Sequence, residues 1–450
     1  MVLLAIDWAS VGVKALQFIL SFSILVTLHE FGHFITARIF KCRVEKFYLF
    51  FDPWFSLFKK KVGDTEYGIG WVPFGGYVKI AGMVDESMDK EQLKQEPKPW
   101  EFRSKPAWQR LIIMCAGVVM NLLLGFFIYS MMLFHWGDEY LPTQNLTYGV
   151  TADSLAQSVG FKNGDKILSV DHKPVERFKN VAMNVILDGA TSVQVDRNGQ
   201  KIDVAIPKTF AGDIIKYKDI AFLSPRYLMY PLGTVVDTMP AKIAGFKVGD
   251  KIIGVNGNAV QFFDQFKESV SNNKGKLVTA KVLRGNDTLN LSVNVPADGI
   301  IGIAPNIPDN ALKTHLTKYG FWESFPGGFQ KGKETLRSYV LQLKLIFSGK
   351  VKANESLGGV ISMGNLFPSL WDWQTFWGLT AFFSMVLALM NILPIPALDG
   401  GHVLFCLIEM ITGRKPSDKT LEVAQMIGMV LLLGLMVYAL GLDFWRLFKK

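Results

Sequence analysis

The chain has 450 residues, half of them apolar and 13% aromatic, and its formal net charge is +9. This composition is typical of a membrane protein that also carries folded soluble parts, with room for about three domains of ordinary size. The charge does not come from a long basic run, so it indicates lysines beside membrane spans, and we expect no nucleic-acid partner. The three cysteines, Cys42, Cys115 and Cys406, form no CxxC pair, which argues against a disulfide framework and a cysteine metal site.

Four long apolar stretches, at residues 11–28, 111–134, 377–393 and 426–442, divide the chain. Each is close to the roughly 20 residues that a helix needs to cross a bilayer. The first stretch lacks a basic n-region and a small-x-small cleavage site, and it runs directly into a polar motif. We therefore interpret it as a retained span and not as a secretory signal peptide.

A polar motif, His29-Glu30-Phe31-Gly32-His33, ends the first apolar stretch. On a helix, histidines four residues apart share one face and can bind one metal ion. Neutral imidazole nitrogens are typical zinc ligands, and bound zinc lowers the pKa of water to about 7. Glu30 is next to His29, where it can take the proton of that water and pass it to a leaving amine. The alternative is a pair of structural histidines at a helix end. Ionisable residues at membrane depth are costly, which favours the functional interpretation.

The charges that flank the apolar stretches predict the orientation of the chain. Loops rich in lysine and arginine stay in the cytoplasm, so both connecting loops are expected there, and the termini and the central region of about 138–370 on the far side. The basic residues of the two loops are Arg38, Lys41, Arg43, Lys46, Lys59, Lys60, Lys61, Arg103, Lys105, Arg110, Arg414, Lys415 and Lys419.

Residues 65–83, TEYGIGWVPFGGYVKIAGM, alternate between apolar and polar side chains and contain a glycine pair. Alternation of this kind is typical of half-buried strands. The stretch therefore predicts the strands of a hairpin near the membrane.

The central region contains a repeat: VGFKNGDKILSVDHKPV begins at Val159 and AGFKVGDKIIGVNGNAV at Ala244. Each copy predicts a Gly-Asp turn, an apolar strand, a polar turn and a second short strand, followed by a helix at 178–187 or 262–270. The pattern resembles two PDZ domains in tandem, of the circularly permuted kind found in bacterial envelope proteases. PDZ domains capture extended peptides at a sheet edge; a simple spacer is the alternative.

After the repeats, residues 335–347 place apolar side chains at helical spacing. This pattern predicts an amphipathic helix. Such a helix lies on the membrane surface or packs on the repeats, and the sequence leaves both options open.

The third apolar stretch ends in NILPIPALDGGH, residues 391–402. Pro394 and Pro396 break the helix, and Asp399 follows. Two histidines need a further protein ligand for zinc, and a lone carboxylate at a broken helix is a candidate. The alternative is that Asp399 caps the next helix, and spacing alone does not decide between the two.

The combination of HEFGH after a first span, NILPIPALDGG after a third span and PDZ-like repeats between them resembles the site-2 protease family of intramembrane zinc metalloproteases. The resemblance covers essentially the whole chain. It implies that His29, His33 and Asp399 bind zinc and that Glu30 is the catalytic base. It also implies that Asn391 contacts the backbone of the substrate.

Two further stretches fit this family. Residues 65–83 resemble its membrane-associated β-element, so Gly75, Gly76 and Tyr77 are expected to bind an unwound substrate as an added strand; a hairpin without a substrate role is the alternative. AGVVMNLLLG, residues 116–125, matches a G-P-x-x-N pattern of the family at Gly117 and Asn121, but a valine stands where proline is usual. The roles of Asn121 and His402 stay open.

The resemblance implies a protease of the bacterial inner membrane, with periplasmic PDZ domains and an active site near the cytoplasmic side. Its partners would be the lipid bilayer and single-pass membrane proteins, among them an anti-sigma factor of an envelope-stress pathway and remnant signal peptides, cut after another protease has removed their outer domains. The repeats would exclude untrimmed substrates. The natural substrate, the cleavage position and the oligomeric state are left open.

The expected fold is a polytopic α-helical membrane protein with four transmembrane helices, a membrane-associated β-hairpin region and two α+β PDZ domains. Two other functions are weighed against the protease: a membrane metal transporter, which does not need Glu30, and a non-catalytic PDZ scaffold, against which the intact motifs argue. The expected segments are 1–137 with two spans and the β-element, 138–222 and 223–308 as PDZ domains, 309–370 as amphipathic linker, and 371–450 with two spans.

Overall fold

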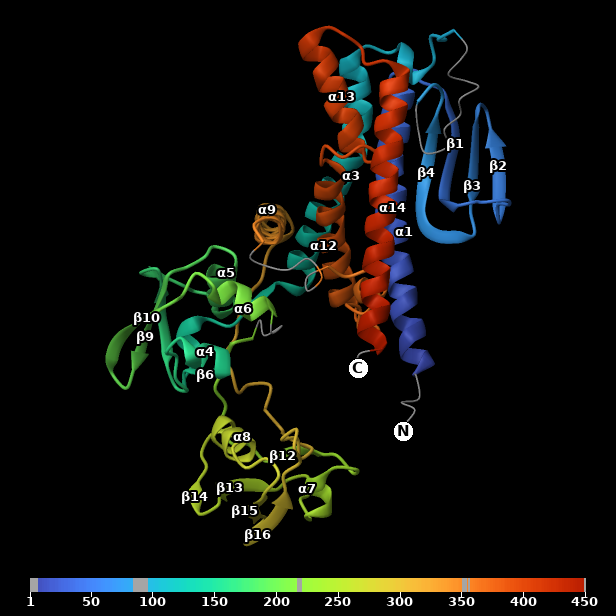
Figure 1. The fold of residues 1–450 in the computed structure, drawn as a ribbon. Helices are drawn as coiled ribbons and strands as arrows, with labels where there is room; N and C mark the ends of the chain where they lie inside the picture. The colour runs from blue at the N-terminus through green and yellow to red at the C-terminus, as the bar shows by residue number, and fades with distance from the viewer. Residues whose placement is uncertain (1–6, 84–95, 217–220, 350–353, 355–356, 449–450) are drawn as a thin grey trace. The chain divides into compact units, whose positions relative to one another are not determined.

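The computed structural model describes residues 7–83, 96–216, 221–349, 354 and 357–448 (Figure 1). They form two compact units. The membrane unit comprises Met1–Asp138, Lys318–Leu343 and Ser356–Lys450, and the α/β unit comprises Glu139–Thr317 and Lys344–Glu355.

Long apolar helices build the membrane unit. Among the described residues, four helices are long and apolar enough to cross a bilayer, which confirms the four predicted spans. The first extends beyond the predicted stretch at both ends. At its start the Asp7 carboxylate accepts hydrogen bonds from the N–H groups of Ala9 and Ser10 and caps the helix. The four helices are α1 (Trp8–Ile39), α3 (Ala107–Trp136), α12 (Trp373–Asn391) and α14 (Asp418–Phe448).

Buried polar side chains join α1, α3 and α12. Thr380 Oγ1 donates a hydrogen bond to Ser21 Oγ at 2.9 Å, and Ser384 Oγ donates to the backbone oxygen of Asn121 at 2.7 Å. Hydrogen bonds of this kind hold helices together where lipid gives no hydrophobic driving force. They fix α12 against the two helices that carry the histidine motif and Asn121.

A four-stranded sheet lies beside the helices, with β4 against α1 (Figure 1). The strand order is β2-β3-β1-β4, and β1 pairs parallel to β3 and antiparallel to β4. The predicted hairpin over residues 65–83 is therefore wrong, since β1 separates the two strands that this stretch forms. The strands are β1 (Val44–Phe51), β2 (Phe58–Val62), β3 (Thr65–Ile69) and β4 (Val72–Ile80).

A close backbone approach explains the crossing from β3 to β4. A side chain at Gly70 would collide with the carbonyl group of Phe51, at the end of β1. Only glycine lets the chain pass over that end. The aromatic strand β1 then fills the centre of the sheet, with Tyr48 fully buried.

Helix α9 (Phe321–Phe347) is longer than the predicted amphipathic segment and is seen end-on in Figure 1, across the long helices. Ser324, Gly328 and Gly332, four residues apart, are its buried positions. A side chain at Gly328 would collide with Ser130 of α3, and one at Gly332 would lie 2.6 Å from Phe126. Small residues at this spacing allow two helix backbones to approach closely.

Two similar subdomains form the α/β unit, and they share one order of elements except for α6, which in the described part of the chain only the first contains. Their four-stranded sheets have the orders β10-β9-β7-β8 and β14-β13-β15-β16. The helices expected after each repeat motif are present as α5 and α8. The first subdomain contains β6 (Val150–Ala152), α4 (Ser154–Ser158), β7 (Lys166–Val170), β8 (Lys173–Pro174), α5 (Phe178–Ile186), β9 (Ser192–Arg197), β10 (Gln200–Ala205), α6 (Phe210–Lys216) and β11 (Leu223–Pro225). The second contains β12 (Leu232–Val235), α7 (Pro240–Ile243), β13 (Lys251–Val255), β14 (Asn258–Ala259), α8 (Phe263–Ser271), β15 (Leu277–Arg284), β16 (Asp287–Asn294) and β17 (Ile303–Pro305).

The buried aspartate of the repeated Gly-Asp turn pairs with an arginine in both subdomains. Arg197 donates two hydrogen bonds to Asp165, both at 2.7 Å, and Arg284 donates two to Asp250 at 2.7 and 2.8 Å. Burial alone would raise the pKa of Asp250, but the hydrogen bonds from Arg284 and from the backbone N–H of Lys247 hold it below its ordinary value. The motif aspartates are therefore structural.

Short elements connect these parts. Strands β5 (Asp138–Tyr140) and β18 (His315–Thr317) pair with each other. The remaining elements are the 3₁₀ turns η1 (Phe102–Ser104) and η2 (Thr143–Asn145) and the helices α11 (Val360–Gly364) and α13 (Asp399–Thr412).

Candidate active site

Helix α1 brings the two motif histidines together. His29 and His33 lie one turn apart, both are buried, and their Nε2 atoms are 3.3 Å from each other. This follows from the helical period, because residues four apart lie on one face.

Asp399 joins the two histidines from the other end of the chain. Its Oδ2 lies 3.0 Å from His29 Nε2 and 3.4 Å from His33 Nε2. It is the first residue of α13, preceded by Leu398 at the capping position. Its carboxylate faces the imidazoles, so the helix-cap alternative for Asp399 is wrong.

The three side chains fit a zinc ion. Their ligand atoms all lie within 4.8 Å of one another. Ligand atoms around a tetrahedral zinc with bonds of about 2.0–2.1 Å are about 3.3 Å apart, close to the separations of 3.0 to 3.4 Å found here. Oδ2 of Asp399 is buried without a hydrogen-bond partner in the described part of the chain. A buried carboxylate oxygen in that state needs a cation.

His33 is held in the protonation form that leaves Nε2 able to bind a metal. Its Nδ1 lies 2.8 Å from the backbone oxygen of Ile113. A carbonyl oxygen can only accept a hydrogen bond, so Nδ1 carries the proton and Nε2 keeps its lone pair toward Asp399.

Two glycines give the imidazoles their space between α1 and α3. A side chain at Gly117 would collide with Nε2 of His33 and lie 2.7 Å from Cε1 of His29. One at Gly32 would lie 2.5 Å from the backbone oxygen of Ala116. The site therefore requires glycine at position 117. The sequence identified Gly117 only as part of a family pattern and gave no physical reason for it.

The turn that carries Asp399 is held by α14. The N–H of Ala397, a residue with a φ of +79°, donates to Oε1 of the buried Gln425 at 3.2 Å. A side chain at Gly428, one turn further along α14, would collide with the carbonyl group of Pro396. Sequence reasoning missed both residues of α14, because an isolated glutamine in an apolar helix gave no indication of its partner.

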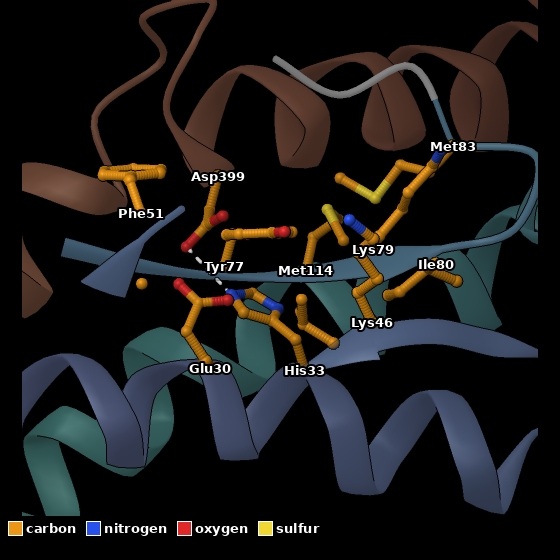
Figure 2. A pocket seen from close by; sticks show the side chains of 12 residues that line it. Glu30, His33, Lys46, Phe51, Tyr77, Lys79, Ile80, Met83, Met114 and Asp399 are labelled. Atoms are coloured by element: carbon orange, nitrogen blue, oxygen red, sulfur yellow. Dashed lines mark ion pairs between the residues drawn. The ribbon is translucent and has the colours of Figure 1, made fainter. Parts of the chain in front are cut away.

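A cavity of about 470 Å³ opens beside the three side chains, between α1 and the sheet. Figure 2 shows Glu30 and His33 extending from α1 toward Asp399, with β4 crossing above them. Val78 of β4 and Glu30 of α1 line this cavity together. This edge of β4 therefore faces the carboxylate that the sequence identified as a candidate base.

The predicted substrate-binding residues of β4 lie at different places around this cavity. Gly76 and Tyr77 line it, together with Lys46 and Lys79, whose side chains sequence reasoning had not singled out. Gly75 has a φ of +101°. It is not among the described residues that line the cavity. Tyr77 stacks on the ring of Tyr48 at 5.3 Å and donates to Asp52 at 2.8 Å, which fixes its ring.

Asn391, the last residue of α12, lies beside the histidines. Its Nδ2 is 3.3 Å from His29 Nε2, so its side chain is within reach of a group bound there. His402 lies on α13, outside the described cluster of His29, His33 and Asp399.

Comparison with known proteins identifies the family. The model of peptidase family M50 matches residues 17–435, which is most of the chain. The chain belongs to peptidase family M50. It is similar to the regulator of sigma-E protease RseP of Escherichia coli, with 30% identity over 96% of this chain and 98% of the relative. It is also similar to RseP of Salmonella typhimurium, with 30% identity, and to the regulator of sigma E protease of Haemophilus influenzae, with 28%, at the same coverage of both chains.

The resemblance to the site-2 proteases is thereby confirmed. The chain is a membrane-embedded metalloprotease of the site-2 type, and its cofactor is zinc. The metal transporter and the non-catalytic scaffold lose their support, since peptidases of this family hydrolyse peptide bonds.

Gly117→Ala tests the space for the imidazoles. The added methyl group should displace both rings and lower the zinc content of the purified protein from about one ion per chain to less than about a tenth, because it would lie 2.4 to 2.8 Å from atoms of both imidazoles. Metal analysis after exhaustive dialysis measures this. The control is Gly434→Ala in α14, where an added side chain would contact nothing within 4 Å and zinc should stay bound. Full zinc occupancy in Gly117→Ala would contradict the arrangement.

Proposed function

We propose that this chain is an intramembrane endopeptidase in which His29, His33 and Asp399 hold the zinc ion and Glu30 is the catalytic base. Its substrates are membrane-spanning segments of single-pass proteins. The observation that carries the proposal is the convergence of two imidazoles and one carboxylate at zinc-ligand separations, next to a cavity that Glu30 lines.

The residues divide the chemistry between them. Zinc, when bound, acidifies water to a pKa of about 7 and polarises a carbonyl group. Glu30 lines the same cavity as His33 and Asp399, so its carboxylate can take the proton of the attacking water and give it to the leaving amine. Val78 lines the cavity beside Glu30. The amide of Asn391 lies 3.3 Å from His29 Nε2, from where it would donate a hydrogen bond to the carbonyl oxygen of a substrate.

Glu30→Gln tests the role of the base. Cleavage of a transmembrane substrate that lacks its outer domain should fall by about 10²–10⁴-fold, the usual contribution of a general base. Bound zinc should be retained, because Glu30 is not one of the three ligands. Gel analysis and mass spectrometry of the products measure the cleavage, with the protein purified in detergent.

Two controls make that result specific. Glu268→Gln removes an exposed carboxylate of the α/β unit and should leave the rate unchanged, whereas His33→Ala should lose both zinc and activity. Cleavage at the wild-type rate by zinc-loaded Glu30→Gln would rule out Glu30 as the base.

We further propose that the substrate binds as a strand added to β4. A helix in the bilayer has every peptide group hydrogen-bonded internally, so it must unwind before a carbonyl can reach the metal. In the described sheet β4 is an outermost strand, and its residues Gly76, Tyr77 and Val78 line the same cavity as Glu30. An extended segment paired there, along Gly75, Gly76 and Tyr77, would run past the catalytic carboxylate.

Backbone methylation of the substrate tests strand addition. A peptide that is N-methylated at two alternate residues beside the scissile bond lacks the N–H groups that would donate hydrogen bonds to β4. Its KM should therefore rise by about 10-fold or more. The same methylation six or more residues away should have little effect. Equal KM values for both peptides would exclude pairing with β4.

The two subdomains of the α/β unit are proposed to be PDZ domains, with boundaries near 138–222 and 223–308. Support comes from the shared order of strands and helices and from the matching Asp–Arg pairs. Their proposed function is to exclude substrates that still carry a bulky outer domain.

Replacing residues 138–308 by a Gly/Ser linker tests this gating. The variant should cut untrimmed substrate at a rate within about 10-fold of the trimmed one, while the intact protein cuts only the trimmed form. A variant that still cuts trimmed substrate and leaves untrimmed substrate intact would show that the repeats do not gate.

The partners and the location follow by analogy. Two relatives carry the name regulator of sigma-E protease, so we propose an anti-sigma factor as a substrate and remnant signal peptides as a second class. The loop charges support an inner-membrane location with periplasmic repeats and an active site near the cytoplasmic side.

A further inference from the structure

The side chain of Asn121 lies behind one of the metal-site histidines. Asn121 is fully buried in α3, and its Nδ2 is 3.2 Å from Nδ1 of His29. Its Oδ1 is buried without a hydrogen-bond partner in the described part of the chain. Burying an amide oxygen without a hydrogen-bond partner costs about 1–3 kcal/mol of folding free energy. The amide orientation with Oδ1 unpaired is therefore unfavourable.

His29 needs an acceptor where Asn121 lies. For Nε2 of His29 to offer its lone pair to a metal, Nδ1 must carry the ring proton and donate it. The amide nitrogen of Asn121 is a donor and cannot accept that proton. A half-turn of the amide exchanges its two atoms with almost no change of shape and brings Oδ1 to Nδ1.

The two histidines would then be held in the same way by the same helix. Nδ1 of His33 donates to the backbone oxygen of Ile113, two turns before Asn121 on α3. At Asn121 a side-chain oxygen takes the place of the backbone oxygen. The position of Asn121 is itself fixed, because Ser384 of α12 donates to its backbone oxygen at 2.7 Å.

We propose that Asn121 is a positioning residue for the metal site: its Oδ1 accepts the Nδ1 proton of His29 and directs Nε2 toward zinc. The inference rests on the proposed role of His29 as a ligand. The alternative is that Asn121 is only a polar contact between helices. That role would not require a particular orientation of its amide, whereas the proposed role requires Oδ1 to face His29. It also gives position 121 a requirement that the sequence pattern alone did not explain.

Two substitutions of nearly equal size separate these roles. Asn121→Asp keeps an acceptor and removes the donor, whereas Asn121→Leu keeps the volume and removes both. The full-length proteins are purified in detergent, loaded with Zn²⁺, and dialysed against a chelator series, and metal retained per chain is measured. Co²⁺ loading gives a second readout, since its visible spectrum reports the geometry of its ligands.

Asn121→Leu should lose Zn²⁺ at a chelator concentration about 10- to 100-fold lower than the wild type, the usual effect of removing a partner of a metal-bound histidine. Asn121→Asp should stay within about 3-fold of the wild type and keep its Co²⁺ spectrum. Ser130→Ala, which removes a different buried polar group of α3, a hydroxyl, should behave as the wild type. Thermal unfolding of each variant checks that it is folded.

The outcomes that overturn the inference are distinct from those that overturn the metal site. Wild-type zinc retention by folded Asn121→Leu, or equal loss of zinc by folded Asn121→Asp, excludes an acceptor role for Asn121. If Asn121→Leu does not fold, the result for Asn121→Asp decides alone. A wild type that binds no more zinc than His29→Ala would instead refute the proposed ligands.

Discussion

Oδ2 of the half-buried Asp399 and the buried imidazoles of His29 and His33 lie together among apolar helices, and the rest of the membrane unit is organised around them. A buried carboxylate is tolerated only when it is paired, because desolvation costs several kcal/mol. The chain satisfies this constraint by bringing residues from near its two ends to one point. A zinc ion bound there would compensate the negative charge.

Close helix packing is the second consequence of that constraint. Ligand atoms about 3 Å apart require the backbones of α1, α3 and the turn before α13 to approach closely, and glycine occupies the contact points. Gly32 and Gly117 allow α1 and α3 to approach closely, and Gly428 allows α14 to pack against the turn that precedes Asp399. The ion pair of Arg110 with Glu409 joins α3 to α13 as well. Asp399 is thus positioned by several helices and not by its own segment alone.

Much of this arrangement could be predicted from the sequence. The spans, the facing histidines and the repeat followed from period and spacing, which are local properties of a chain. The predictions that failed concerned contacts between distant segments. The predicted hairpin was wrong, because β1 lies between β3 and β4, which are neighbours in sequence. The partners of Gln425 and Asn121 were missed, since a single polar residue in an apolar helix does not indicate which distant segment it contacts.

The most direct test of the metal site is the zinc X-ray absorption spectrum of the purified protein. The account predicts a first shell of nitrogen and oxygen at about 2.0–2.2 Å, with the outer scattering of two imidazole rings and without sulfur at about 2.3 Å. Asp399→Ala should lose an oxygen neighbour or the metal itself. A sulfur shell, or a spectrum that the Asp399 substitution leaves unchanged, would contradict the proposed site.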